Sequence, residues 1–221
     1  MLYYGNAITC SGKILVFGIP REVFRDLLKH YQSAGINATL LDKKSSETIA
    51  GETAIKIEGR NFDLVVLKFA RGSMAVGRGG GFGPSISKKV TKTHPVINFH
   101  HIIKGLDKRN EDDLKAEMKE EKKGFLSKKL VNVSWQGGKL AKKLNEDTEL
   151  KNMILKTQTT SLKVEPDTKN NCIRIIHQKK IDMIVESGGV FLKKTETRAE
   201  NFPSIKTLDI IDRIAEYAKA L

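Results

Sequence analysis

The stretch with the clearest chemical potential is the segment 64–106, which contains no Asp or Glu and includes a glycine-rich run at 77–84. Glycine lets backbone N–H groups approach an anion closely, so glycine-rich loops often bind phosphate groups. A dinucleotide-binding motif needs a third glycine where this chain has Phe82 or Pro84, and no Gly-Lys-Ser/Thr sequence follows to form an ATP-type phosphate loop. The sequence therefore predicts neither phosphate motif.

Positive charge is the property that remains in this segment. Arginine and glycine together with an aromatic residue are typical of flexible segments that bind RNA through phosphate contacts and base stacking. We therefore predict a polyanion-binding loop, against the alternative that the loop is a long connection between two strands with no ligand. The candidate contact residues are Lys68, Arg71, Arg78, Phe82, Lys88, Lys89 and Lys92.

A second stretch without acidic residues runs from 122 to 145 and surrounds the only tryptophan, Trp135. Basic residues around an aromatic side chain can form a nucleic-acid surface in which the ring stacks on a base. The competing interpretation places Trp135 in the core and the lysines on a solvated surface. The candidate contacts are Trp135, Lys139, Lys142 and Lys143, in a stretch that also contains Lys122, Lys123, Lys128 and Lys129.

Catalytic and metal-binding chemistry has less support in the sequence. His100 and His101 are neighbours on a predicted strand, so they point to opposite faces and cannot easily hold one metal ion together. The serine motif at 83–87 lacks the second glycine of a nucleophile elbow. Carboxylates at 111–121 lie among lysines with nothing to bury them, so they do not resemble a general acid or base in a cleft. We predict no catalytic residue, no metal site and no cofactor, and we favour a non-enzymatic protein.

Charge is the outlier in the composition. The 221-residue chain carries 39 Lys and Arg against 26 Asp and Glu, a formal net charge of +13. Such a surplus attracts nucleic acid, anionic membranes or acidic partners. The alternative is a proteome with lysine-rich surfaces, as accompanies high growth temperature, which carries no functional message. Cys10 and Cys172 are too few for a disulfide framework, and no apolar run reaches the roughly 20 residues that span a bilayer. We therefore expect a soluble cytoplasmic protein with no transmembrane segment.

Hydrophobic periodicity predicts an α+β protein with two regions of the order β-α-β-β-β, mixed or antiparallel sheets and a C-terminal helix. Continuous or alternating apolar runs indicate strands, and apolar residues spaced by three and four indicate helices. The predicted strands are 13–18, 36–41, 54–58, 62–69, 95–103, 130–135, 161–165, 172–177 and 181–186. The predicted helices are one from 20 to 35, two short ones on either side of Asp147, and one at 204–221.

These elements divide the chain into an N-terminal region, residues 1–105, which contains the glycine-rich basic loop at 70–94, and a C-terminal region, residues 129–221. The residues between them, 106–128, carry mixed charges and few apolar side chains, so we predict a short solvated helix that serves as a linker. The sequence leaves open whether the two regions are separate subdomains or share one continuous sheet. It also leaves open whether their common order of elements reflects duplication.

The sequence thus predicts a basic protein that binds a polyanion without catalysis, with nucleic acid as the first choice. An alternative is an interaction or scaffold module at an acidic partner or an anionic membrane surface. A third is an enzyme acting on a phosphorylated small molecule, in which the glycine-rich loop closes over the phosphate. The oligomeric state is not predicted.

Overall fold

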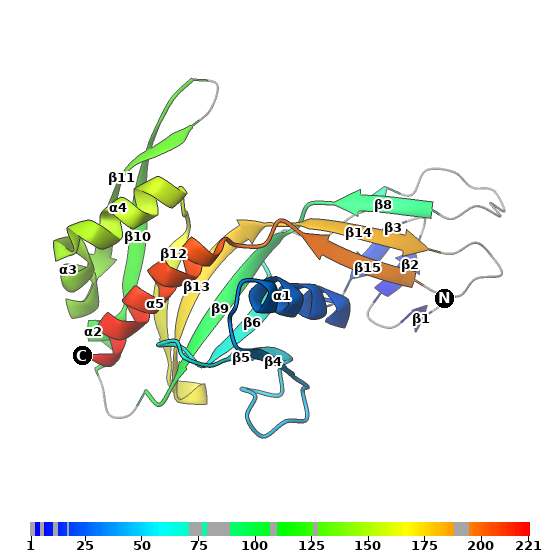
Figure 1. Ribbon diagram of the computed structural model, residues 1–221, viewed down its shortest axis with the longest axis horizontal. Coiled ribbons are helices and arrows are strands. Elements are labelled where there is room, and N and C mark those ends of the chain that lie inside the picture. Colours follow the sequence, from blue (N-terminus) through cyan, green and yellow to red (C-terminus); the bar gives the residue numbers. More distant parts are fainter. Residues whose placement is uncertain are drawn as a thin grey trace.

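The computed structural model describes residues 3–4, 7–10, 13–16, 18–70, 77–78, 89–106, 110–125, 128–187 and 195–221, and at 3–16, 77–78, 89, 187 and 195 it describes the backbone alone. The chain folds into antiparallel β-sheets with helices packed on one face of the main sheet (Figure 1). The predicted α+β class, with antiparallel sheets and a C-terminal helix, is confirmed.

The main sheet has eight strands in the order β11-β10-β12-β13-β9-β6-β5-β4. Every neighbouring pair in it is antiparallel. Helices cover one face, so its strands alternate between side chains that face the helices and side chains on the opposite face, called the open face below. Its strands are β4 (Ala38–Leu41), β5 (Ala54–Ile57), β6 (Leu64–Phe69), β9 (Val96–Lys104), β10 (Ala116–Lys123), β11 (Lys129–Gly137), β12 (Leu162–Asp167) and β13 (Cys172–Lys180).

The centre of this sheet is the pairing of β9 with β13. Nine residue pairs join the two strands, from Val96 opposite Lys180 to Lys104 opposite Cys172. β9 belongs to the predicted N-terminal region and β13 to the predicted C-terminal region. Of the two arrangements that the sequence leaves open, the structure therefore shows the continuous sheet, while the region boundaries at 105 and 129 stay a prediction.

Two smaller sheets extend the molecule beyond the main sheet. β8 (Lys89–Thr93) and β14 (Asp182–Ser187) continue the chain paths of β9 and β13, and β15 (Thr195–Glu200) completes a sheet of order β15-β14-β8. The other small sheet has the order β1-β2-β3-β7. Its strands are β1 (Tyr3–Tyr4), β2 (Ala7–Cys10), β3 (Lys13–Val16) and β7 (Gly77–Arg78).

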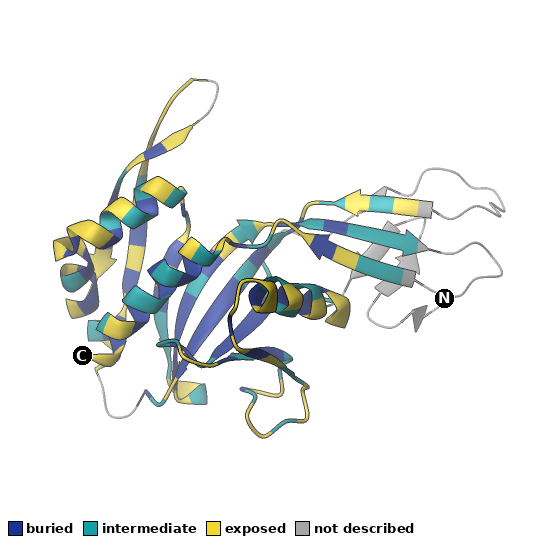
Figure 2. Ribbon diagram, viewed as in Figure 1, coloured by how far each residue is buried: buried dark blue, intermediate teal, exposed yellow. Residues whose placement is uncertain are grey.

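The helices bury their apolar faces against one side of the main sheet (Figure 2). Val23 and Leu27 of α1 and Ile211 and Ile214 of α5 show the helical spacing of three or four residues, and all four are fully buried in the same cluster as Phe99 of the sheet. The helices are α1 (Arg21–Ser33), α2 (Glu111–Leu114), α3 (Lys139–Glu146), α4 (Thr148–Thr157) and α5 (Ile205–Lys219), with a 3₁₀ turn η1 (Thr168–Asn170).

The charged segment between the two regions forms a strand, and the prediction of a solvated helix is wrong beyond Leu114. α2 has a single turn, and β10 begins at Ala116. Ala116 and Met118 are buried while Glu117 and Lys119 are exposed, which is the two-residue alternation of a strand. Pairing with β11 therefore decides the structure of a segment whose own composition favours a helix.

The order of elements predicted for each region is confirmed, but their pairing differs. β3 precedes α1 and lies in the four-stranded sheet, whereas β11 precedes α3 and forms one edge of the main sheet. After the helices, β4, β5 and β6 are consecutive neighbours in the main sheet, whereas β14 leaves it. A duplicated unit would keep its strand order, so the structure does not support duplication.

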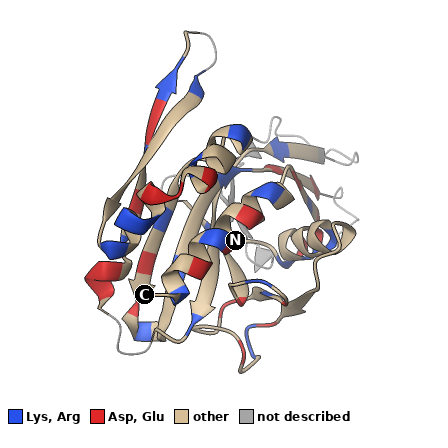
Figure 3. Cartoon of the chain, turned by 60° about the vertical axis from the view of Figure 1, so that its left-hand side comes forward, with Lys and Arg blue, Asp and Glu red and all other residues tan. Residues whose placement is uncertain are grey.

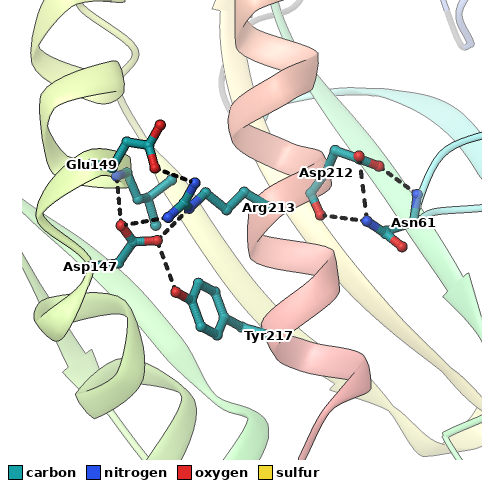
Figure 4. Close-up of polar contacts among 7 residues, drawn as sticks. Asn61, Asp147, Glu149, Asp212, Arg213 and Tyr217 are labelled. Atoms are coloured by element: carbon teal, nitrogen blue, oxygen red, sulfur yellow. Dashed lines mark hydrogen bonds and ion pairs between the residues drawn. The ribbon is translucent and has the colours of Figure 1, made fainter.

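The C-terminal helix α5 is tied to α4 by a polar cluster around Asp147, the N-cap of α4 (Figure 4). Arg213 contacts both carboxylate oxygens of Asp147, through Nε and through Nη2 at 3.0 Å. Asp147 also accepts hydrogen bonds from the Leu150 N–H at 2.9 Å and from the Tyr217 hydroxyl at 3.0 Å. The side chain of Asp147 is only 2% exposed, so these donors stabilise a carboxylate that water cannot solvate.

The same helix also contacts the turn between β5 and β6. Asp212 accepts a hydrogen bond from the backbone N–H of Asn61 (Figure 4). In the same turn, Arg60 Nη1 lies 2.7 Å from Asp209 Oδ1. α5 therefore connects elements of the C-terminal region with elements of the N-terminal region on the helix-covered face of the sheet.

Replacing Arg213 with Ala should lower the free energy of unfolding by about 2–3 kcal/mol, because it leaves a buried carboxylate without its cation. Chemical denaturation at pH 7 measures this loss. The control variant Lys206→Ala removes an exposed lysine of the same helix that has no ion pair among the described residues, and it should cost less than about 0.5 kcal/mol. Equal losses in the two variants would contradict the role given to Arg213.

Asp147 should also make stability depend on pH. Burial raises the pKa of Asp147, but the hydrogen bonds from Arg213, Leu150 and Tyr217 outweigh it and hold this pKa below its ordinary value. A carboxyl group with a lowered pKa stabilises the fold above its unfolded pKa, about 3.9, and loses this contribution as the pH falls through the lower, folded-state pKa. Denaturation of wild type and Asp147→Asn should therefore differ most near neutral pH and progressively less below about pH 4. The same difference at pH 3 and pH 7 would rule this out.

Candidate polyanion-binding surface

The predicted contact residues of the first stretch are spread over separate elements. Lys68 lies on β6, with its Nζ atom 2.7 Å from Glu52 Oε1, and Lys92 lies exposed on β8 with no ion pair among the described residues. For Arg78 on β7 and Lys89 on β8 the structure describes the backbone alone. Arg71, Phe82 and Lys88 lie outside the described residues, as do most residues of the glycine-rich segment.

The predicted contact residues of the second stretch lie on α3 and β11. Lys139 Nζ is 2.8 Å from Asp113 Oδ2, whereas Lys142 and Lys143 have no ion pair among the described residues. Trp135 is 5% exposed and belongs to the core cluster that faces the helices. Its ring offers no face on which a base could stack, so the structure shows the core position that was the competing interpretation.

These two groups of residues do not meet on one surface. α3 and β8 lie at opposite ends of the long axis of the molecule (Figure 1). A single flat ligand surface formed by Lys92, Lys142 and Lys143 is therefore excluded.

A projecting hairpin, called the arm below, carries the basic residues that come first in the second stretch. β10 pairs with β12 only at Ala116 and Glu117, but it pairs with β11 as far as Lys123 opposite Lys129. The remainder of β10 and β11 therefore forms a two-stranded ribbon that extends beyond the main sheet (Figure 1). The arm consists of residues 121–131, of which the structure describes 121–125 and 128–131.

The base of the arm is fixed to α4. The side chain of Gln158, the C-cap of α4, accepts a hydrogen bond from the Leu130 N–H at 2.8 Å and donates one to the Leu130 carbonyl at 3.2 Å. The Ser161 N–H donates to Glu120 on the other strand. Both strands are thus held where the arm leaves the body of the protein.

Lysines and one aromatic residue occupy the end of the arm. Lys122 and Lys123 lie on one strand, Lys128 and Lys129 on the other side of the turn, and all four are exposed. Phe125 is 100% exposed. Figure 3 shows Lys and Arg near the end of the arm with acidic residues below them.

Acidic residues neutralise the arm only in part. Lys122 Nζ lies 2.6 Å from Glu120 Oε2, and Lys123 Nζ lies 3.4 Å from Glu121 Oε1. Lys128 and Lys129 have no ion pair among the described residues. Exposed ion pairs of this kind contribute little free energy and are screened by salt. All four lysines therefore remain available to a polyanion.

The sequence contains a signal for this arm that the helix prediction overlooked. Gly124 and Phe125 stand between the lysine pairs 122–123 and 128–129, and glycine inside a charged run marks a turn. A fully exposed Phe, instead of the buried Trp135, is the aromatic residue that accompanies the lysines.

The described part of the chain does not show the geometry expected of a catalytic site. A pocket of about 630 Å³ between the start of α1 and the 42–53 loop mixes Arg21, Lys43 and Lys44 with Asp42 and Glu52, and Arg21 pairs with Asp42 at 2.7 Å. None of these five residues is fully buried, and Glu52, whose Oε2 atom is buried, forms an ion pair with Lys68 through Oε1. Both carboxylates of this pocket are therefore paired with a cation, unlike the general acid or base of a catalytic cleft.

The described residues contain no group of three or more His, Cys, Asp or Glu side chains arranged to hold a metal ion. Among the described helices, none combines the length and the apolar character needed to cross a membrane.

Comparison of the chain with protein-family models, with curated proteins and with solved structures gives no match, so its function has to be inferred from its own residues.

Proposed function

We propose that this protein binds nucleic acid without catalysis and that the arm is the element that contacts it. The observation that carries the proposal is a two-stranded ribbon that ends in two lysine pairs around a fully exposed Phe125. Phosphate contacts by lysine supply most of the affinity in sequence-tolerant binding of this kind.

The shape of the arm suits nucleic acid. A two-stranded β-ribbon fits the major groove of duplex DNA, and lysines on both of its strands can reach the two phosphate backbones. An aromatic side chain at the end of such a ribbon can stack on an unpaired base or insert between bases. Phe125 can do either because its side chain is 100% exposed.

The charge distribution favours nucleic acid over a membrane surface. Lys156 is exposed in the last turn of α4, two residues before the C-cap Gln158 that bonds to Leu130 at the base of the arm. An exposed cation therefore stands near the base of the arm as well as at its end, where a flat membrane would not reach but a polyanionic chain would. Burial of one Phe contributes only about 1.5–3 kcal/mol, which is a single weak signal for membrane attachment.

The predicted contacts between the 70–94 segment and a polyanion are a separate proposal. Lys92 on β8 lies at the end of the molecule opposite α3, so this segment would form a separate contact from the arm (Figure 1).

Replacing Lys122, Lys123, Lys128 and Lys129 together with Ala should remove most of the affinity for DNA and RNA oligonucleotides. Because each phosphate contact adds about 0.7–0.9 to the slope of log affinity against log salt, the slope should fall by about 3. Fluorescence anisotropy with labelled oligonucleotides at several salt concentrations measures both quantities.

A matched control has the same change in charge. It replaces Lys43, Lys169, Lys206 and Lys219, four exposed lysines off the arm that have no ion pair among the described residues. If both variants lost the same affinity for oligonucleotides, the attraction would come from the net charge of the whole protein, and the arm would not be the binding element. If the wild-type protein bound phosphatidylserine vesicles and no oligonucleotide, the arm would instead belong to a membrane surface.

Replacing Phe125 with Ala should weaken binding of single-stranded oligonucleotides about tenfold through lost stacking, with an unchanged salt slope and an unchanged melting temperature. Val131→Ala, which shortens a 41% exposed apolar side chain on the same arm, is the control and should leave affinity as it is. Phe125→Trp should keep the affinity and report contact through quenching of its fluorescence. If Phe125→Ala bound oligonucleotides as tightly as the wild type, the Phe125 ring would not be part of the interface.

A further inference from the structure

A polar cluster lies at the centre of the open face of the main sheet, away from the arm. It contains Lys68 of β6, Asn98 and His100 of β9, and Arg174 of β13. The register places His100 opposite Val66 on one side and Ile176 on the other, and it places Asn98 opposite Lys68. Alternate residues of a strand share a face, so Arg174 joins the face that contains Ile176.

Several polar atoms of this cluster are buried without a partner. His100 and Arg174 are each 8% exposed. Both ring nitrogens of His100, Nη1 of Arg174 and Oδ1 of Asn98 are buried and have no hydrogen-bond partner among the described residues. Unpaired buried polar groups are rare in native proteins because they lose their hydrogen bonds to water, and several of them close together mark a place where a polar ligand or water can bind.

Two cations lie beside His100, and each of them also has a carboxylate partner. Arg174 Nε lies 2.7 Å from Asp167 Oδ2 on β12, and Lys68 Nζ lies 2.7 Å from Glu52 Oε1 in the loop before β5. β12 lies beyond β13, and β5 lies beyond β6, relative to β9. Lys68 and Arg174 therefore lie on the two strands that flank His100, and Asp167 lies farther out on β12. Glu52 belongs to a loop whose Ile49 packs against Ile102 of β9 and Cys172 of β13, so this loop lies over the same face.

The pKa of His100 is lowered by its burial and by the two neighbouring cations. Burial first, and then the charges of Lys68 and Arg174, lower it to about 3, with a smaller lowering by His101 and an opposing effect of Asp167. The imidazole is therefore neutral at pH 7, with one N–H to donate, and a positive potential surrounds it.

We propose that Lys68, His100 and Arg174 form a binding site for a small oxyanion such as a phosphate group. The oxyanion accepts hydrogen bonds from Arg174 Nη1 and from the imidazole N–H, and its charge complements the two flanking cations. It thereby supplies partners for the donors that the chain leaves unpaired. This site goes beyond the nucleic-acid contact of the arm, because none of its residues lies on the arm.

A bound oxyanion should raise the pKa of His100, because an adjacent negative charge favours imidazolium. By linkage, the affinity for the oxyanion should then rise as the pH falls toward the raised pKa. Lys68, Arg174, His101, Asp167 and Glu52 are the charged or titratable groups around this imidazole, and sulfate is the suitable probe because its own charge stays constant over this range.

The test is titration of the full chain with inorganic phosphate, sulfate and a nucleoside monophosphate at constant ionic strength. Calorimetry measures the binding, and the side-chain NMR signals of His100 report whether the ligand binds beside this residue. Saturable binding that shifts these signals is expected. Lys68→Gln and Arg174→Gln should each weaken it about tenfold or more, because each removes a charged donor. Lys180→Gln, which removes an exposed lysine further along β13, should not change the affinity.

Three results would overturn the site: no saturable binding of any probe, signals of His100 that do not respond, or undiminished binding in Lys68→Gln. Lys68 is 40% exposed, so this variant tests the site even if the loss of Arg174 unfolds the chain. Tighter binding of the nucleotide than of phosphate would identify a nucleotide as the source of the oxyanion, and equal binding would identify free phosphate. Oligonucleotide binding by the arm is measured separately, and its failure leaves this site unaffected.

Discussion

The antiparallel pairing of β9 with β13 is the contact on which the rest of the structure depends. It joins the two regions, and its register decides which neighbouring histidine faces which side, because a slip by one residue exchanges the faces of a strand. At the observed register His101 enters the helix-facing core, where its ring packs edge-on against Phe62 with centroids 5.0 Å apart and burial lowers its pKa to about 4. His100 is left on the open face between Lys68 and Arg174. One imidazole thus packs in the core, and its neighbour belongs to the polar cluster on the opposite face.

The sheet alone would not fix the position of the helices, and α5 supplies that constraint. Asp147 connects α5 to the beginning of α4, and Gln158 connects the end of α4 to Leu130 at the base of the arm. A continuous series of hydrogen bonds therefore runs from the C-terminal helix to the arm. An element that is held in place before its ligand arrives loses less conformational entropy on binding, so this support would favour the contact proposed for the arm.

Patterns of apolar residues along the sequence predicted the helices and strands with strong periodicity. They failed where pairing between strands decided the secondary structure. The apolar spacing of Val23 and Leu27 predicted α1, and the separation of His100 from His101 follows from strand geometry alone. β10 was missed because its buried side chains are few, and only the partner strand β11 makes their two-residue alternation meaningful. The order of strands that brings Lys68, His100 and Arg174 together depends on contacts between residues far apart in sequence, which spacing along the chain does not contain.

The net charge of +13 does not by itself distinguish a binding protein from a protein with a generally lysine-rich surface. Some of the positive charge sits on the solvent side of β10 and β12, where Lys119 pairs with Glu117 and Lys163 with Glu165, two residues apart on the same strand. Such pairs keep a sheet surface soluble and contribute little else. The informative cations depart from this pattern, either because they stand on a projecting ribbon, as in the arm, or because they are buried with an unpaired donor, as is Arg174. Position relative to the sheet, more than the number of lysines, therefore separates a candidate site from the background charge.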